Sequence, residues 1–338
     1  MPLPGKKSCL IDECINEDDI VIKNIKNNLQ LRFVQFMHPG VEPEVEFDSK
    51  TGQYYTPWNY GSHKRKFLKA KGKYVKNGSL KTAELIFWGE WEPDSVATPF
   101  NPMPPISDKE LPHYIHTPNL KLTANGSPIW PIANKKPTNT DPLVFGDAFY
   151  YSCCQQLRTY KKTKVTSPTA LHSLERGSII LFGSPLNPRK TNAAFMLDTV
   201  FVVEDSRLFN TNRFVKDFSG FVFKDYFPIM GLYSNGKTGY PFRCYKGATP
   251  CNNVDGMFSF APCHISSSGL APSNLKRPLL RQKDFAGLGI EPTDYFNERL
   301  TQGFKTHVST LPINKAIWQR IVDIVTSQGY ELGVQFNY

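Results

Sequence analysis

The chain has 338 residues, of which 40% are hydrophobic and 21% are charged. That length is enough for one large domain or two ordinary ones, and that composition excludes global disorder. The balance of 40 Lys and Arg against 30 Asp and Glu gives a net charge of +10. A positive charge of this size favours polyanionic partners, and nucleic acid is the commonest of them.

Cysteine usage and the absence of apolar segments indicate the compartment. The 7 cysteines are an odd number, and the N-terminus lacks the apolar core of a signal peptide. No apolar run approaches the ~18 residues that a membrane span needs. We therefore expect a cytoplasmic protein without a disulfide framework or a membrane partner, of unknown oligomeric state.

The first half of the chain is predicted to be rich in strands. Residues 20–38 indicate one or two strands that end at His38-Pro39-Gly40, and residues 43–62 indicate a loop lined with aromatic rings. A basic segment at 63–73 precedes a strong strand at Leu85–Trp88. The proline-rich residues 93–142 predict an ordered excursion or linker with little regular structure.

Two further units follow. Residues 171–205 predict a pair of buried strands, and residues 215–263 predict irregular β structure with tight turns. A helix is expected over 314–327, capped by Asn314 and ended by Gly329, followed by a strand at 330–336. The expected organisation is a β-rich core at 18–205 and a Phe/Tyr/Gly-rich elaboration at 206–338. The expected fold class is α+β, mostly β: an antiparallel barrel with long loop insertions and a C-terminal helix–strand unit.

The most informative string is Glu84-Leu-Ile-Phe-Trp-Gly-Glu-Trp-Glu92. Strand alternation places Trp88, Glu90 and Glu92 on one face, and Phe87 and Trp91 on the other. A ring beside carboxylates suits the reading of an unpaired base, because the ring stacks and the carboxylates accept hydrogen bonds. Two core tryptophans beside a solvent-facing glutamate pair explain the same string.

The carboxylates also have a catalytic interpretation. Glu90 and Glu92 are candidates for acid–base chemistry, with Asp198 as a third candidate because it interrupts the apolar strand 195–203. Burial of Asp198 would raise its pKa and demand a partner, whereas an outward position on a half-exposed strand would do neither. The sequence leaves these alternatives open.

The basic segment supplies the candidate phosphate contacts. His63, Lys64, Arg65 and Lys66 are expected to contact nucleic acid, with aromatic residues interleaved among the lysines of 63–73. A solvated face, or pairing of Arg65 and Lys66 with buried carboxylates, accounts equally for these charges.

Other motifs predict no cofactor and no metal. The spacing of Cys244, Cys251, Cys263 and His264 matches no zinc pattern, so buried inert thiols are expected there. We assign Asp141 and Asp147 to turns and caps, and draw nothing from the pair Cys153-Cys154. The chain lacks a Walker loop, a dinucleotide fingerprint and a nucleophile elbow, which argues against ATPases, dinucleotide oxidoreductases and serine hydrolases.

Residues 171–205 resemble the PUA-like superfamily, which includes the ASCH and EVE domains. The resemblance lies in the turn and strand Leu174-Glu-Arg-Gly-Ser-Ile-Ile-Leu-Phe-Gly183 and the returning strand Phe195–Val203. It implies a small, partly closed β-barrel whose pocket receives a base of RNA or a modified nucleotide. The chain also resembles bacterial or phage proteins associated with nucleotide modification.

These observations lead to one expected function and two alternatives. The first is a nucleic-acid or nucleotide-binding protein that accepts an unpaired, possibly modified, base in an aromatic and carboxylate pocket. The second is an enzyme on nucleotides or nucleic acid, a glycosidase or nuclease. The third is a protein-interaction factor that uses aromatic loops.

Overall fold

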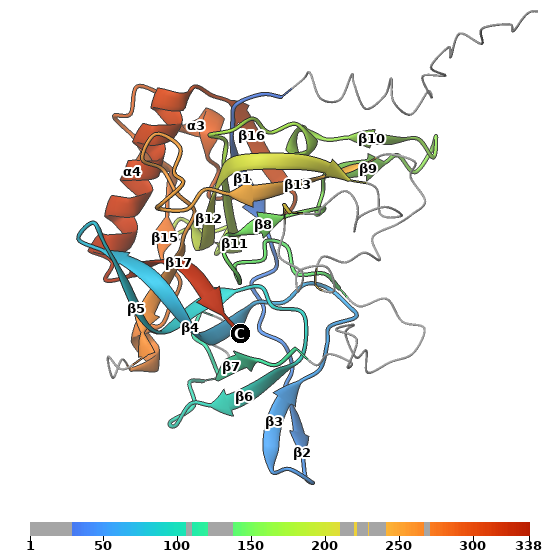
Figure 1. Ribbon diagram of the computed structural model, residues 1–338, viewed down its shortest axis with the longest axis vertical. Helices are drawn as coiled ribbons and strands as arrows, with labels where there is room; N and C mark the ends of the chain where they lie inside the picture. The colour runs from blue at the N-terminus through green and yellow to red at the C-terminus, as the bar shows by residue number, and fades with distance from the viewer. Residues whose placement is uncertain are drawn as a thin grey trace, which may run out of the picture.

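The computed structural model describes residues 29–105, 110–120, 138–209, 220–221, 229, 241–266 and 271–338. Strands dominate these residues, and two large mixed sheets lie one above the other in Figure 1. The expectation of a mostly β fold with a C-terminal helix is therefore confirmed. Residues 20–28 of the first expected strand segment lie outside the described residues.

The first sheet has seven strands in the order β16-β1-β11-β12-β13-β8, with β15 paired to β12. The pair β1–β11 is parallel, whereas β11 and β12 form the antiparallel hairpin that residues 171–205 predicted. The strands are β1 (Arg32–Met37), β8 (Tyr150–Tyr151), β11 (Ile179–Leu186), β12 (Ala194–Phe209), β13 (Phe242–Gly247), β15 (Leu279–Leu280) and β16 (Phe304–Val308).

The second sheet has eight strands in the order β17-β14-β5-β4-β7-β6-β3-β2. Strand β17 also pairs with β4, so β4, β5, β14 and β17 form a closed cycle of antiparallel pairs. The strands are β2 (Glu46–Asp48), β3 (Gln53–Thr56), β4 (Lys66–Lys76), β5 (Ser79–Gly89), β6 (Ser95–Pro99), β7 (Tyr114–Pro118), β14 (Ala261–Ile265) and β17 (Glu331–Asn337). A separate arm consists of β9 (Leu157–Thr159) and β10 (Thr166–Pro168).

The core lies on both faces of the first sheet. One face, with Phe36 and Phe182, packs against residues of the second sheet such as Phe87. The other face, with Phe33 and Val200, packs against the C-terminal helix. Strands buried on both faces read as continuous apolar runs, which is why Ile179–Phe182 and Phe195–Val203 were recognisable from sequence.

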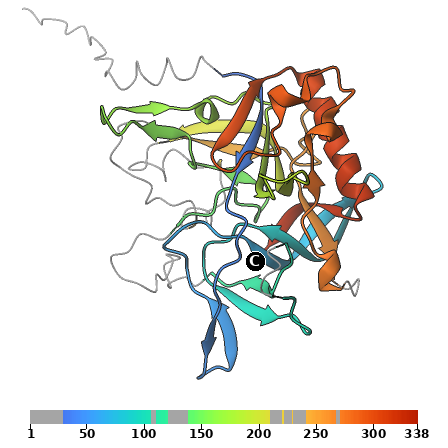
Figure 2. The ribbon, with the colours of Figure 1, turned by 180° about the vertical axis from the view of Figure 1, so that it is seen from behind.

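Helix α4 (Leu311–Ser327) lies along one side of the first sheet (Figure 1, Figure 2). It begins three residues before the expected start, at N-cap Thr310, so Asn314 is not the cap. Asn314 is buried instead and its Nδ2 donates to the carbonyl oxygen of Gly177 at 2.9 Å. The stop at Gly329 is confirmed, since this residue has φ 87°. A second helix, α3 (Pro292–Tyr295), and 3-10 turns at Ala170–His172, Pro272–Asn274 and Gln282–Phe285 complete the described helices.

Three expectations need correction. The ring-lined segment 43–62 contains the β2–β3 hairpin, which projects as an arm at the bottom of Figure 1. The proline-rich segment supplies β6 and β7, because prolines at strand ends do not block pairing. The boundary expected at 205/206 falls inside β12, and both sheets contain strands from both sides of it.

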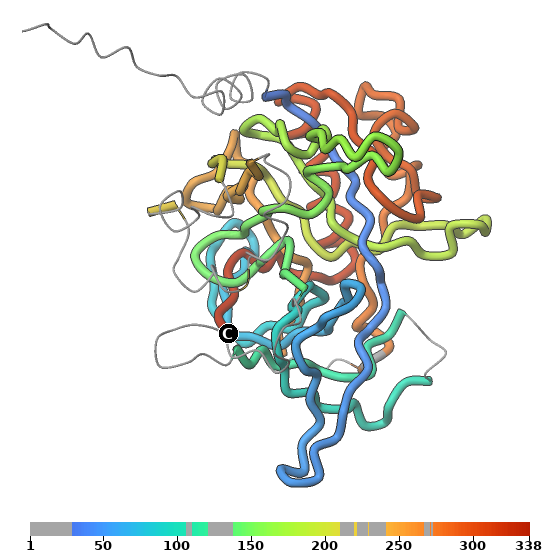
Figure 3. Tube along the Cα trace, turned by 90° about the vertical axis from the view of Figure 1, so that its right-hand side faces the viewer, coloured from blue at the N-terminus to red at the C-terminus, as the bar shows by residue number. Residues whose placement is uncertain are grey.

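The segment after β1 connects the two sheets. Figure 3 shows it running down the molecule from the first sheet to the β2–β3 arm. His38, directly after β1, contacts Phe182 of β11 in the first sheet and Arg65, the residue before β4 of the second. Among the described residues, none of the helices has the length and apolar character to cross a membrane.

Candidate active site

A cluster of charged and polar side chains is buried between the two sheets. Its members come from the end of β1, the residues before β4, the residues after β5, the middle of β12, and two loops: His38, His63, Arg65, Glu90, Glu92, Asp141, Asp198 and Arg277. All are buried except His63, whose side chain is 25% exposed. Buried charges must be paired or hydrogen-bonded, and here every member except Asp141 lies within ion-pair distance of another, while Asp141 accepts backbone N–H groups.

Arg65 is the centre of this cluster. Its NH1 lies 2.6 Å from Glu90 Oε2, and its Nε lies 2.9 Å from Asp198 Oδ2. Its NH2 contacts His38 Nδ1. Burial opposes the charge of Arg65, but Glu90 and Asp198 outweigh burial and raise its pKa. Arg65 therefore joins a residue of each sheet through a fixed positive charge.

A β-bulge positions Asp198. The register between β11 and β12 jumps from Phe182 opposite Thr199 to Gly183 opposite Leu197, which leaves Asp198 without a partner in the ladder. Such an extra residue turns its side chain away from the regular alternation. Asp198 is 3% exposed and contacts two arginines, Arg65 and Arg277. The two arginines are the partners that burial of the Asp198 carboxylate requires.

Trp88 does not offer the expected stacking surface. The Arg277 guanidinium lies 3.9 Å from the ring centroid, and Trp88 Nε1 donates to the carbonyl oxygen of Leu275 at 2.8 Å. The ring is 4% exposed and packs with Phe67 and Ile86. A base cannot stack there without displacing Arg277, so the role expected for Trp88 needs correction.

Glu90 and Glu92 converge on His63. Strand β5 ends at Gly89, so both glutamates lie beyond regular alternation, yet each reaches His63 Nδ1 with its Oε1, at 3.0 and 3.1 Å. Asn59 Nδ2 donates to Glu92 Oε2 at 2.6 Å. Burial lowers the pKa of His63, but Glu90 and then Glu92 outweigh burial and raise it to about 11. The charges of His63 and Arg65 likewise outweigh burial at Glu90 and lower its pKa.

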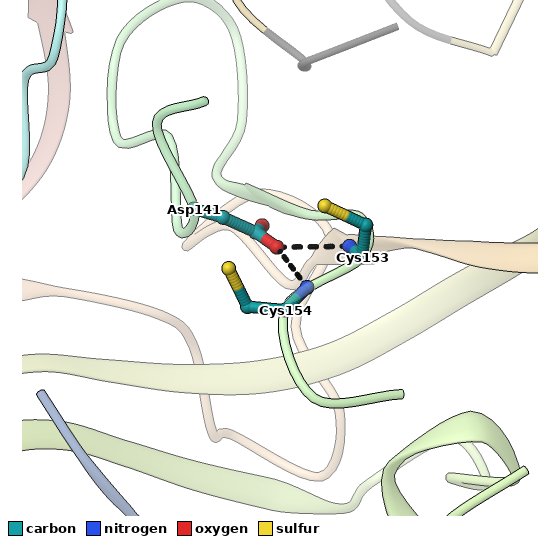
Figure 4. A group of neighbouring side chains, drawn as sticks. All are labelled: Asp141, Cys153 and Cys154. Carbon is teal, nitrogen blue, oxygen red and sulfur yellow. Dashed lines mark hydrogen bonds between the residues drawn. The ribbon is translucent and has the colours of Figure 1, made fainter. Parts of the chain in front are cut away.

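Asp141 builds the turn that carries two cysteines. Its carboxylate accepts the backbone N–H of Ser152 at 2.7 Å. It also accepts those of Cys153 and Cys154 at 2.8 Å (Figure 4). Burial raises the pKa of Asp141 to about 6, against the opposing effect of these three bonds. Its own N–H donates to Glu90 Oε1 at 2.9 Å, which fixes the turn to the cluster.

Cys154 faces the free side of His63. Its Sγ lies 4.0 Å from His63 Nε2, the ring nitrogen opposite the glutamates. Asn139 Nδ2 approaches both sulfurs, at 3.2 Å from Cys153 Sγ and 3.8 Å from Cys154 Sγ. A hydrogen bond with Cys153 and burial raise the pKa of the Cys154 thiol. The group thus has the order thiol, imidazole, carboxylate, as in enzymes with a cysteine nucleophile.

A pocket adjoins this group. Gln155, directly after Cys154, has φ 57°, a left-handed conformation that is costly for a residue with a side chain and concentrates at functional sites. Gln155 and His38 both line a pocket of about 510 Å³. The rings of His38 and His63 are parallel, with centroids 5.9 Å apart. The pocket therefore adjoins the group through His38 and Gln155, and Cys154 and His63 are not among the residues that line it.

The structure brings together only part of the expected phosphate-binding set. Arg65 and Lys66 are 1% and 2% exposed, and Lys66 Nζ donates to the carbonyl oxygen of Pro93 at 3.0 Å, so phosphate contacts by these two need correction. Lys64 is partly exposed, and its backbone N–H donates to Glu92 at 3.3 Å. The exposed positive charge lies further along β4, at Lys71 and Lys73.

Sequence reasoning missed, or gave another role to, three residues of the cluster and the cysteine beside it: His38, Asp141, Arg277 and Cys154. His38 and Asp141 have a usable signal, because polar residues directly after an apolar strand or before proline gather at strand ends and turns. Cys154 and His63 are 91 residues apart, and no spacing rule connects them.

The comparisons with known proteins add no relative. No family model matches the chain, and no similar curated protein or solved structure was found.

Proposed function

We propose that this chain is an enzyme whose reaction centre consists of Cys154, His63 and Glu92. The observation that carries the proposal is the position of His63 between a thiol and a carboxylate. Its Nε2 lies 4.0 Å from Cys154 Sγ and its Nδ1 lies 3.1 Å from Glu92 Oε1. Contacts of this kind are often loose without substrate and tighten when it binds.

In this proposal Cys154 is the nucleophile and His63 is the proton donor. With its pKa near 11, His63 is an imidazolium at neutral pH, with Nδ1–H held by Glu92 and Glu90. The thiol proton leaves to solvent, the sulfur bonds to an electrophilic carbon, and His63 protonates the leaving group from Nε2. The oxygen of a water then bonds to the carbon as the sulfur–carbon bond breaks. The proton that this water releases and the one taken up again from solvent restore the thiol and the imidazolium.

The carboxylates have different roles from those expected. Asp198 contacts two arginines and Glu90 contacts Arg65, so both carboxylates belong to buried ion pairs. We assign both to positioning: Glu90 fixes the His63 ring and the turn of Asp141, and Asp198 fixes Arg65. Glu92 orients His63 and stabilises its charge.

Nucleotides are the substrate class that we propose. The net charge of +10 favours an anionic substrate, and a pocket of about 510 Å³ lies in the size range of small-molecule sites. Free thiols at Cys153, Cys154, Cys244, Cys251 and Cys263 support a cytoplasmic location.

Incubation with pools of ribonucleotides, deoxynucleotides, short DNA and short RNA tests the proposal. Mass spectrometry is expected to detect a product, or an adduct on Cys154, with the native chain and neither with Cys154→Ser. Cys251→Ser is the matched control, since Cys251 is exposed and remote in the chain, and it is expected to behave as the native chain. Equal turnover by Cys154→Ser, or no product and no adduct in any pool, contradicts the proposal.

A second candidate function is the base reader expected from sequence. The observation that favours it is a basic face on β4, where Lys69, Lys71 and Lys73 alternate with buried residues. Lys69 pairs with Glu84 at 3.0 Å, so Lys71 and Lys73 are the main phosphate contacts of this face in the proposal. The PUA-like resemblance belongs to this candidate. Its support is the β11–β12 hairpin and the cycle of β4, β5, β14 and β17.

A further inference from the structure

The pair Cys153-Cys154 has a second use that the proposed reaction leaves open. One ligand atom from each of Asp141, Cys153 and Cys154 lies within 4.8 Å of the others, and the same holds for His63, Glu90 and Glu92. The two groups meet at the contact of 4.0 Å between Cys154 Sγ and His63 Nε2. Cys154 Sγ therefore lies between a second thiol, that of Cys153, and an imidazole nitrogen.

We infer that Cys153 Sγ, Cys154 Sγ and His63 Nε2 bind one Zn²⁺ or a similar soft divalent cation. Two thiolates and one imidazole, with a fourth position left open, form a common donor set for this ion. Binding a divalent ion here needs no oxidant, because the thiols and the imidazolium release protons to solvent as the metal bonds form.

The one sulfur–nitrogen distance observed is close to that of such a site. Zinc–sulfur and zinc–nitrogen bonds of about 2.3 and 2.0 Å at a tetrahedral angle place sulfur and nitrogen roughly 3.5 Å apart. The observed separation of Cys154 Sγ and His63 Nε2 is 4.0 Å. A rotation of the His63 ring or of the cysteine side chain that brings the two atoms a few tenths of an ångström closer removes the difference.

The surroundings of the donors support the inference independently. A metal-binding histidine usually donates its other ring N–H to a carboxylate, and His63 Nδ1 lies 3.0 and 3.1 Å from two glutamate oxygens. Asn139 Nδ2 donates to Cys153 Sγ at 3.2 Å. Asp141 holds the N–H groups of both cysteines, so the turn is already formed before a cation arrives.

The glutamate side of His63 is a poorer cation site. Arg65 occupies Glu90 Oε2 at 2.6 Å, and Asn59 occupies Glu92 Oε2 at 2.6 Å. Glu90 Oε1 also accepts the N–H of Asp141 at 2.9 Å. A hard cation there would lie beside the positive charge of Arg65. On the sulfur side the neighbouring positive group is His63 itself, which becomes a metal ligand once its Nε2 releases its proton.

The consequence is regulatory. A cation on Cys154 Sγ occupies the lone pair that the proposed reaction needs, so metal binding and nucleophilic attack exclude each other. The metal site itself does not rest on the proposed enzyme activity. It stands or falls by a binding measurement on the full chain.

Equilibrium dialysis of the full chain against Zn²⁺, with metal quantified by mass spectrometry, is the primary experiment. We expect one equivalent to bind, and at least a tenfold loss of affinity in Cys153→Ser and in Cys154→Ser. Cys251→Ser is expected to bind as the native chain does. Failure to bind one equivalent, or equal affinity in all three variants, overturns the inference.

A measurement on the native chain guards against misfolded variants. Saturation with Zn²⁺ is expected to slow the alkylation of both Cys153 and Cys154 at least tenfold, with Cys251 labelled as before. Co²⁺ in place of Zn²⁺ is expected to give a thiolate charge-transfer band. Protection of other cysteines instead, or no thiolate band, overturns the inference. Alkylation of Cys154 in chelator reports on the nucleophile alone, so the two proposals fail separately.

Discussion

Asp198 Oδ2 lies 2.9 Å from Arg65 Nε, and this contact joins the middle of β12 in one sheet to the start of β4 in the other. Asp198 reaches it because a bulge removes the residue from the ladder. The contact holds the two sheets together close to the place where His63 and Cys154 meet.

Replacing Asp198 is expected to destabilise the fold strongly. Asp198→Asn keeps the shape but leaves Arg65 and Arg277 with one buried negative charge fewer. Removing one partner of a buried charge pair costs about 3–5 kcal/mol in free energy of unfolding. Urea titration checks the value. The control is Asp255→Asn, whose exposed pair with Lys315 at 3.1 Å contributes about 1 kcal/mol or less. Equal losses in the two variants would mean that the buried network is not coupled to the fold.

The buried Lys66 predicts a pH dependence of stability. Burial lowers the pKa of Lys66 to about 7, whereas an unfolded lysine has a pKa of about 10.4. Between these values the unfolded chain binds the proton and the folded chain does not, so the free energy of unfolding from this group rises with pH. Lys66→Met lacks this pH-dependent contribution to the free energy of unfolding. Its stability advantage over the native chain is expected to shrink as pH rises from about 7 to about 10.

The measurement is a series of urea titrations of both chains across that interval. Lys71→Met, at an exposed position of the same strand, is expected to give a constant difference. A difference for Lys66→Met that is independent of pH would show that Lys66 remains charged in the folded state.

Asp141 is expected to hold the cysteine turn. Asp141→Asn replaces one acceptor oxygen by an NH₂ group, which faces backbone donors and cannot accept from them. The amides of Cys153 and Cys154 are then expected to exchange hydrogen at least tenfold faster, a loss of about 1.4 kcal/mol. Hydrogen exchange resolved by residue is the measurement. The control is Asp147→Asn, because the side chain of Asp147 is 61% exposed. Unchanged exchange in Asp141→Asn would refute the role of the Asp141 carboxylate.

The lysine face of β4 separates the two candidate functions. If the chain is a reader, Lys71→Glu with Lys73→Glu reverses two charges on an exposed face and weakens binding to single-stranded DNA or RNA at least tenfold. The salt dependence of binding should become shallower at the same time. Fluorescence anisotropy at several salt concentrations measures both. Lys50→Glu with Lys81→Glu controls for the change in net charge. An equal loss of binding in this control would mean that the β4 face is not the binding surface.

The sequence predicted the elements better than their assembly. The runs at 179–182 and 195–203 are buried on both sides, so their apolar character was visible without knowledge of the fold. The hairpin β2–β3 was missed because Glu46, Phe47, Tyr54 and Tyr55 form a short exposed arm with little burial to produce a pattern. The start of α4 was missed because Asn314 resembles a cap, whereas its side chain serves the buried carbonyl of Gly177.

The site was only half predictable. Glu90 and Glu92 were recognisable because two carboxylates beside tryptophans are unusual, and they do converge on one side. Trp88 was misplaced because alternation ends with β5 at Gly89, and because Arg277 comes from 189 residues away in the chain to cover the ring. Contacts between distant segments, such as Cys154 with His63, depend on how the two sheets pack and leave no local pattern.

The rate of alkylation of Cys154 by iodoacetamide, resolved by peptide mass spectrometry in the presence of a chelator, tests the reaction centre most directly. Burial and the Cys153 hydrogen bond raise the pKa of the Cys154 thiol, and in the proposal the positive charge of His63 opposes them. His63→Gln, which removes the charge but can still reach Glu92, is therefore expected to slow the reaction at least tenfold. Labelling of the exposed Cys251 is expected to be unchanged and serves as the internal control. An unchanged or faster reaction of Cys154 in His63→Gln would mean that His63 merely covers the thiol, and it would contradict the proposed role of this pair.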